Sequence, residues 1–372
     1  MFSHFLRKIE DHFIKELPFV VYRKGGQDEI TAVFQTENKL HHLKNYRESG
    51  FVFAPFNDDK SPIVLKTDEV RKINHPIKPS GPYQKVQHPK IDEKQKNFHL
   101  NLIEKGMKEI QRGRLKKVVL SRALEVNNNQ KPLVLFTELL VLYPNAFCYV
   151  WYHPKVGMWL GATPETLLQL ENRKLTTMSL AGTLPVVKDK VPLWGLKERE
   201  EQHLVTEFIA GTLRDRVDDL QVYDTKSVRA GNLWHLQTSV LGTLKEDGLE
   251  DIIRGLHPTP AICGFPQSLS KDFILANEGY DRTYYAGFLG ELNFEKHMDR
   301  SAHSKNQENK AYRSIKKTTH LFVNLRCMKL RGEKAILYMG GGITKDSIPE
   351  REWRETRDKS ATMLRVLQAN NN

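Results

Sequence analysis

Two adjacent lysines begin a strand-like run in "GRLKKVVLSRALEV", residues 113–126. In a strand, Lys117 would share a face with Val119 and Ser121, and Lys116 would lie on the opposite face. A lysine on a buried face can act as a general base, because desolvation disfavours its charged form. Two solvated lysines at a strand end are the commoner arrangement. The run therefore offers a candidate base without deciding which lysine is buried.

Glu165 follows a proline in "GATPETLLQL", between two apolar stretches. A carboxyl group in apolar surroundings can keep its proton near neutral pH and serve as a general acid. A capping or surface glutamate is the alternative, and it is the commoner role for this residue type.

Paired carboxylates occur in two segments with helical patterning. Glu198 and Glu201 are three residues apart in the first, and Glu352 and Glu355 repeat that spacing in the second. Each pair would share a helix face. Solvated helix surfaces are the ordinary explanation of such pairs. The alternative is that the two acidic faces converge on a hard cation such as Mg²⁺, which binds carboxylate oxygens.

Two further motifs bring backbone amides or a histidine near a possible ligand. Gly340, Gly341 and Gly342 follow an apolar strand in "YMGGGITKDS", so their amides could approach an anion closely. The GK[ST] ending of a P-loop is missing, and no dinucleotide fingerprint occurs. His257, in the proline-rich "LHPTPAICGFP", is a candidate ligand or proton donor, or a hydrogen-bonded core histidine.

The composition is that of an ordinary globular protein. The 372 residues are 39% hydrophobic and 27% charged, and the three cysteines lie far apart without a CxxC spacing. This cysteine pattern predicts a reducing compartment. The amphipathic N-terminal segment predicts a surface helix of a cytoplasmic protein rather than a secretion signal. No window reaches the roughly 18 consecutive apolar residues of a membrane span.

The chain carries an excess of positive charge. Its 57 Lys and Arg against 45 Asp and Glu give a formal charge of +12, which favours an anionic partner. Nucleic acid is one candidate, but the densest basic cluster, residues 295–317, contains no nucleic-acid motif and no interleaved aromatic residues. That cluster is typical of a solvated loop or insertion, and we expect no nucleic-acid partner.

Strand-like runs dominate the elements that must position these groups. Residues 1–90 contain four short runs, FVVYR, ITAVFQ, GFVFAPF and PIVLK, and end in a proline-rich stretch. Apolar residues at helical spacing follow and stop at Gly113. Many further strands joined by short turns come next. This order predicts an α+β protein with large antiparallel sheets.

Taken in order, the segments resemble one family, the chorismate-utilising enzymes, which comprises isochorismate, salicylate, anthranilate and aminodeoxychorismate synthases. The matching segments are KVVLSR, PETLL, SLAGT, the glutamate-rich helix, HPTPAICGFP, YYAGFLGEL, VNLRC and the run from GGGIT to EWRET. They cover residues 95–367, and residues 1–90 resemble the variable N-terminal part of the same α+β unit. The resemblance implies two large antiparallel β-sheets stacked face to face, with helices on the outside.

The resemblance also implies roles for individual residues. Glu201 and Glu355 are similar to the family's Mg²⁺ ligands, with Glu198 and Glu352 holding the ion directly or through water. The ion would bind the ring carboxylate of chorismate. The enolpyruvyl carboxylate would be held by Arg326 and Tyr285. The remaining substrate-binding positions are Gly182, Thr183, His257, Gly340, Gly341, Gly342 and Lys359.

Within the family, the chain resembles isochorismate synthases most closely. Lys117 matches the water-adding enzymes, whereas the ammonia-adding enzymes carry a non-basic residue there. Ala181 stands where aminodeoxychorismate synthases carry a nucleophilic lysine, and alanine offers no nucleophile. The resemblance implies that Lys117 deprotonates a water that attacks C2 of chorismate, while Glu165 protonates the departing 4-hydroxyl. No redox cofactor is implied.

Two alternatives stay open at this point. Salicylate synthase shares the lysine and the glutamate and then eliminates pyruvate, although the segment HPTPAICGFPQ is more similar to isochorismate synthases. A basic nucleic-acid-binding protein is the alternative from another class. The sequence does not distinguish menaquinone from siderophore biosynthesis, or a monomer from a weak dimer.

Overall fold

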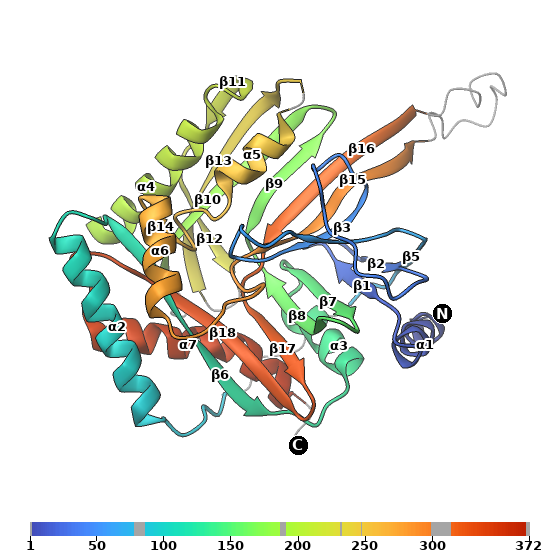
Figure 1. Ribbon diagram of the computed structural model, residues 1–372, viewed down its shortest axis with the longest axis horizontal. Coiled ribbons are helices and arrows are strands. Elements are labelled where there is room, and N and C mark those ends of the chain that lie inside the picture. Colours follow the sequence, from blue (N-terminus) through green and yellow to red (C-terminus); the bar gives the residue numbers. More distant parts are fainter. Residues whose placement is uncertain are drawn as a thin grey trace.

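Two large antiparallel sheets and seven helices make up the part of the chain that the structure describes (Figure 1). The computed structural model describes residues 2–77, 86–186, 191–230, 233–246, 248–298 and 314–369. The predicted α+β class with two large sheets is confirmed. Among the helices in these ranges, we find none with the length and apolar character needed to cross a membrane.

The first sheet, sheet A, contains nine strands, and every neighbouring pair is antiparallel. Their spatial order is β14 (Gly264–Phe265), β6 (Lys117–Asn127), β18 (Lys334–Ile343), β17 (Cys327–Arg331), β8 (Gly157–Thr163), β7 (Phe147–His153), β1 (Phe19–Arg23), β2 (Glu29–Phe34) and β5 (Glu69–Asn74). Lys117 is therefore the first residue of a strand near one end of this sheet.

Sheet B is also antiparallel and contains nine strands. Eight of them lie in the order β11 (Val217–Val222), β13 (Leu233–Leu244), β10 (Lys174–Pro185), β9 (Thr166–Glu171), β16 (Ser314–Val323), β15 (Phe288–Met298), β3 (Gly50–Ala54) and β4 (Ile63–Leu65), and β12 (Lys226–Ala230) pairs with β13. The N-terminal part of the chain thus supplies strands to both sheets.

Aromatic side chains fill the space between the sheets. The ring centroid of Phe53 in sheet B lies 4.7 Å from that of Trp151 in sheet A. Phe322 stacks on Phe147 with centroids 4.0 Å apart. Each fully buried large apolar side chain contributes about 1.5–3 kcal/mol relative to an exposed one. This shared core fixes the two sheets against each other and therefore fixes the relative position of any residues that they jointly present.

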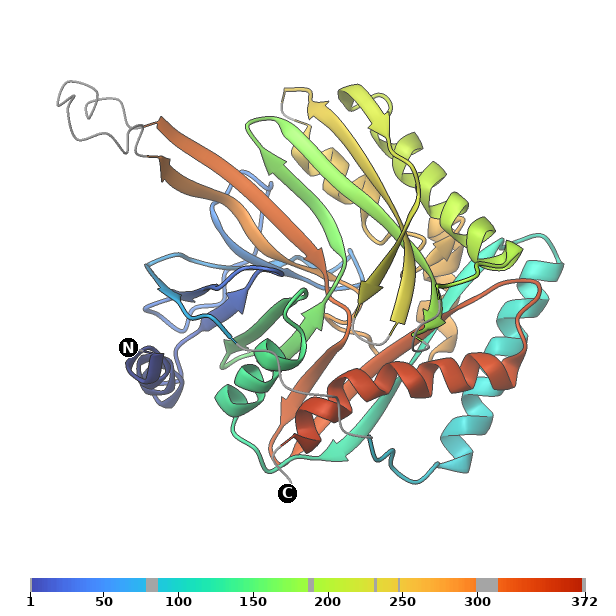
Figure 2. The ribbon, with the colours of Figure 1, turned by 180° about the vertical axis from the view of Figure 1, so that it is seen from behind.

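The helices lie outside the stacked sheets, as predicted (Figures 1 and 2). At one end of sheet A, α1 (Phe2–Ile14) contacts β1 and α3 (Pro132–Leu142) contacts β7. At the other end, α2 (Glu93–Gln111) and α6 (Gln267–Asn277) contact β6, and α7 (Pro349–Gln368) contacts β18. On sheet B, α4 (Leu196–Leu213) contacts β10, and α5 (Leu249–Leu256) lies on α4.

The predicted basic insertion, residues 295–317, falls mostly outside the described residues. Its two described ends belong to strands, because β15 continues to Met298 and β16 begins at Ser314. The described ends of this segment are therefore strand, and the rest of the predicted loop or insertion lies outside the described residues. The antiparallel pairing of β15 with β16 continues into this polar segment, as far as Met298 and Ser314.

Candidate active site

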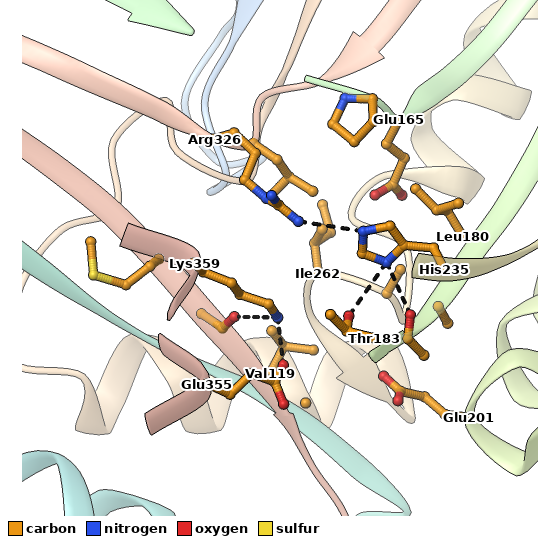
Figure 3. Close-up of a pocket in the computed structure, with 18 of the residues that line it drawn as sticks. Val119, Glu165, Leu180, Thr183, Glu201, His235, Ile262, Arg326, Glu355 and Lys359 are labelled. Atoms are coloured by element: carbon orange, nitrogen blue, oxygen red, sulfur yellow. Dashed lines mark hydrogen bonds and ion pairs between the residues drawn. The ribbon is translucent and has the colours of Figure 1, made fainter. Parts of the chain in front are cut away.

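An open cavity lies where strands of both sheets meet α4 and α7 (Figure 3). Its walls come from β6 and β18 of sheet A and from β10 and β13 of sheet B. The predicted site residues that line it are Glu165, Gly182, Thr183, Glu198, Glu201, Tyr285, Arg326, Gly340, Gly342, Glu355 and Lys359. Residues scattered along the whole predicted catalytic region therefore converge on one space.

Lys117 lies directly behind this lining. Its side chain is 1% exposed, and its Nζ lies 2.7 Å from Oε1 of Glu201. Lys116 is exposed and places its ammonium 5.5 Å from the ring centroid of Phe265. The alternation along β6 therefore turns the second lysine inward, which decides the question that the sequence left open. Ser270 fixes the strand there by donating to the Lys117 carbonyl at 3.1 Å.

Glu165 is a buried carboxyl group on the cavity wall. It is 4% exposed and lies in the short turn between β8 and β9. Burial raises the pKa of Glu165 to about 8, although the positive charges of Lys117 and Arg326 oppose this shift. Glu165 is consequently protonated at neutral pH. The environment required of a general acid is present, and the surface-glutamate alternative is wrong.

Four carboxylates from two helices form what we call the acidic centre, defined as Glu198, Glu201, Glu352 and Glu355. The first pair comes from α4 and the second from α7. Glu198, Glu201 and Glu355 line the cavity, and Glu352 lies beside it with 3% of its surface exposed. The two acidic helix faces therefore do converge, and neither is an ordinary solvated surface.

Hydrogen bonds from neighbouring residues hold the two acidic helices in place. On α4, Gln202 donates to Oγ of Ser179 at 2.7 Å and to Oγ1 of Thr238 at 2.9 Å, which ties the helix to β10 and β13. On α7, Thr356 accepts from Nε of Arg122 at 2.8 Å. The Arg122 guanidinium also lies 4.2 Å from the ring centroid of Trp353. The residues next to the carboxylates are thus anchored to the sheets.

Of the three consecutive glycines, Gly342 makes room for the acidic centre and Gly341 lies in ordinary contact with it. A Cβ on Gly342 would lie 2.8 Å from Oε1 of Glu201, and a Cβ on Gly341 would lie 3.8 Å from Glu352 and 3.9 Å from Glu355. Gly340 serves the other wall, because a Cβ there would lie 2.9 Å from the Tyr285 hydroxyl. Gly341 does not line the cavity and instead faces the α7 carboxylates.

The acidic centre suits a hard divalent cation in its chemistry. Carboxylate oxygens are the ligands that Mg²⁺ prefers, and this ion usually keeps waters or substrate oxygens in its remaining positions. The glycine cradle lets carboxylates from α4 and α7 approach β18 together. In the described part of the chain, however, no three acidic, histidine or cysteine side chains are already grouped as a metal site. Three of the four carboxylates are instead paired with lysines, and Glu198 accepts a hydrogen bond from the backbone N–H of Gly195.

Arg326 and His235 form a polar pair on the cavity wall (Figure 3). His235 Nδ1 lies 3.0 Å from the Gly182 carbonyl, so this nitrogen donates, and Nε2 is left to accept from Arg326 Nη2 at 3.5 Å. Burial, together with the Arg326 charge, lowers the pKa of His235 to about 3. His235 is therefore neutral, and Arg326 keeps its positive charge directed toward the cavity.

Two basic residues of the cavity lining, His235 and Lys197, were not among the residues predicted from the sequence. His235 sits in a strand where alternation alone does not separate a functional histidine from a core histidine. Lys197 stands one residue before the glutamate-rich segment, where a lysine is expected on any solvated helix. The structure places both on the cavity wall.

The structure does not bring His257 to this cavity. Its ring is 5% exposed, its Nε2 lies 3.1 Å from the Pro55 carbonyl, and it packs edge-on against Phe288. Burial lowers the pKa of His257 to about 4. His257 is thus a hydrogen-bonded core histidine, the alternative that the motif had left open, and it is not among the cavity-lining residues.

The chain belongs to the family of chorismate binding enzymes, whose sequence pattern matches residues 52–313 and 311–368. Isochorismate synthase EntC of Escherichia coli K12 is 30% identical over 263 residues, or 68% of this chain. That match spans 62% of the length of EntC. Isochorismate synthase DhbC of Bacillus subtilis is 27% identical over 346 residues, which cover 84% of this chain and 79% of that protein.

Solved structures agree on the fold. A putative 2,3-dihydroxybenzoate-specific isochorismate synthase, DhbC from Bacillus anthracis, superposes with a TM-score of 0.75 at 23% identity, covering 95% of this chain and 97% of that chain. MenF, the menaquinone-specific isochorismate synthase from Escherichia coli, superposes with a TM-score of 0.72 at 22% identity, covering 94% of this chain and 89% of that chain. At these identities the likeness concerns the two-sheet architecture.

Proposed function

We propose that this protein is an isochorismate synthase that converts chorismate to isochorismate with the help of Mg²⁺. The observation that carries the proposal is one cavity that combines a buried carboxylic acid, Glu165, with a buried lysine, Lys117, and an acidic centre. Curated relatives named as isochorismate synthases support this assignment.

Glu165 is assigned as the general acid. The reaction must release hydroxide from C4, which is a poor leaving group unless it is protonated as it departs. A carboxyl group with a pKa of about 8 carries the necessary proton at neutral pH. Its position on the cavity wall lets it reach bound substrate.

Lys117 is assigned as the general base that takes a proton from the attacking water. It is a buried lysine at the edge of the cavity. Its ammonium contacts Glu201 in the structure, so the contact must open and the proton must leave before Lys117 can act as a base. Acid and base thus stand in opposite protonation states during one reaction.

The remaining residues bind and orient an anionic substrate. Arg326, with Tyr285 beside it on the wall, suits a carboxylate because a guanidinium forms charge-assisted hydrogen bonds. Mg²⁺, when bound by the acidic centre, would neutralise the substrate's ring carboxylate and fix the ring. The protein's excess of positive charge would also attract a dianion such as chorismate. We place the enzyme in the cytoplasm, because its three widely separated cysteines favour a reducing compartment.

Product analysis in ¹⁸O-labelled water tests the proposal. The purified protein is incubated with chorismate and Mg²⁺, the products are separated by HPLC, and their masses are measured by mass spectrometry. Isochorismate carrying one ¹⁸O per turnover is expected, because the new hydroxyl at C2 comes from water. Salicylate with pyruvate would assign the protein to the salicylate synthases, and unlabelled isochorismate would rule out attack by water.

Lys117→Met should lower the rate of isochorismate formation by roughly 10²–10⁴, because it removes the proposed general base.

A further inference from the structure

Three lysines occupy the acidic centre, each on a different glutamate. Lys117 pairs with Glu201 at 2.7 Å, and Lys359 pairs with Glu355 at 2.7 Å. The third, Lys197 Nζ, donates to Oε1 of Glu352 at 2.9 Å. Three ammonium groups therefore nearly balance four carboxylates before any metal arrives.

Lys197 differs from the other two in its exposure and in what it connects. Its side chain is 33% exposed, against 1% for Lys117 and 17% for Lys359. It rises from the first turn of α4 and reaches Glu352 on α7, so this ion pair links the two acidic helices. Of the three lysines, Lys197 would therefore lose the fewest protein contacts if its side chain turned out into water.

Glu352 needs a cation at all times. Its side chain is 4% exposed, and a buried carboxylate without a partner costs several kcal/mol. The Lys197 ammonium, 2.9 Å from Oε1 of Glu352, is a suitable resident partner.

Mg²⁺ and the Lys197 ammonium cannot share the same Glu352 oxygen. Mg²⁺ holds its ligands at about 2.0–2.1 Å in a near-octahedral shell. An ammonium 2.9 Å from Oε1 would therefore have to move before the ion could bind the same oxygen. We propose that Lys197 is the built-in competitor of the divalent cation: it holds α4 to α7 while the acidic centre is metal-free, and it yields Glu352 when the ion binds.

This inference rests on the proposed function, because it assumes that the acidic centre takes a divalent cation. The competition lowers the affinity for Mg²⁺, since each binding event must first break an ion pair. It also keeps the centre folded when the metal is absent.

Calorimetric titration of Mg²⁺ into the substrate-free protein tests the proposal. Lys197→Met keeps the length of the side chain but removes its charge, and we expect it to tighten Mg²⁺ binding about tenfold or more. Arg199→Met is the matched control, because it removes one positive charge from an exposed position two residues along α4. The control should change the affinity by less than about twofold.

Thermal unfolding with and without Mg²⁺ provides a second readout that does not depend on turnover. Metal-free Lys197→Met should melt below the wild type, because Glu352 loses its partner, and Mg²⁺ should raise its melting temperature by more than it raises that of the wild type. Equal Mg²⁺ affinities for the wild type and Lys197→Met would overturn the competition alone. Absence of Mg²⁺ binding by both proteins would overturn the metal site of the proposed function as well.

Discussion

At the scale of residues, the site depends on two buried groups, and for one of them, Glu165, burial raises the pKa of the carboxyl to about 8. Glu165 is buried, and among the described residues it forms no salt bridge. Lys117 is also buried, and it pairs with Glu201. The acid and base roles of these two residues could be predicted from the sequence only because the motifs, taken in order, resemble those of the chorismate-utilising enzymes. Their burial could not, because it depends on contacts between segments far apart in the chain.

Glu165 gives a pH dependence with a definite sign. Its pKa is raised to about 8, so the protonated acid is present below this pH and is lost above it. We expect kcat of the wild type to fall as pH rises through about 8. Glu165→Gln should lower kcat by roughly 10²–10⁴ and remove this descending limb.

The matched control for that change is Glu171→Gln on the same part of the chain, where the glutamate is exposed. It should leave both the rate and the pH profile unchanged. A Glu165→Gln protein that keeps the wild-type rate and the wild-type descending limb would show that another group supplies the proton. Circular dichroism is the check that both variants are folded.

At the scale of elements, the acidic centre exists because α4 and α7 approach the same strand, β18. The spacing of the two glutamate pairs predicted a shared face on each helix, and this much follows from helix geometry. The convergence of the two faces does not follow from spacing. It depends on Gln202 anchoring α4, on Arg122 anchoring α7, and on the glycines of β18 between them.

The glycine run gives a test within three residues. A methyl group at Gly342 would lie 2.8 Å from Glu201 and 3.1 Å from Lys117 Cε, whereas one at Gly341 meets nothing nearer than 3.8 Å. Gly342→Ala should therefore displace the Glu201–Lys117 pair and lower kcat/KM by at least about tenfold. Gly341→Ala, the matched control, should retain most of the activity. Steady-state kinetics measure both, and equal effects of the two substitutions would contradict the close-packing account.

At the scale of the whole molecule, the two sheets carry the cavity and must hold a fixed relative position. Aromatic contacts provide most of that fixation, and one polar cluster adds to it. Tyr22 of sheet A donates to Oε1 of Glu291 in sheet B at 2.5 Å, and Lys24 pairs with the other carboxylate oxygen at 2.6 Å. The sequence predicted two antiparallel sheets, but not which strands exchange such contacts.

Glu291→Ala should lower the free energy of unfolding by about 3–5 kcal/mol, because it leaves two polar groups without their buried partner. Glu29→Ala is the control, since the Glu29–Lys72 pair is exposed and should contribute no more than about 1 kcal/mol. Chemical denaturation measures both. A loss at Glu291 no larger than that at Glu29 would show that the sheets are joined by apolar packing alone.

The most direct measurement is HPLC of chorismate incubated with the purified protein without an ammonia source, first with Mg²⁺ and then with EDTA. The account predicts isochorismate with Mg²⁺ and none with EDTA. Isochorismate formed equally in both conditions would contradict the role of the acidic centre. Unchanged chorismate in both conditions would contradict the proposed function itself.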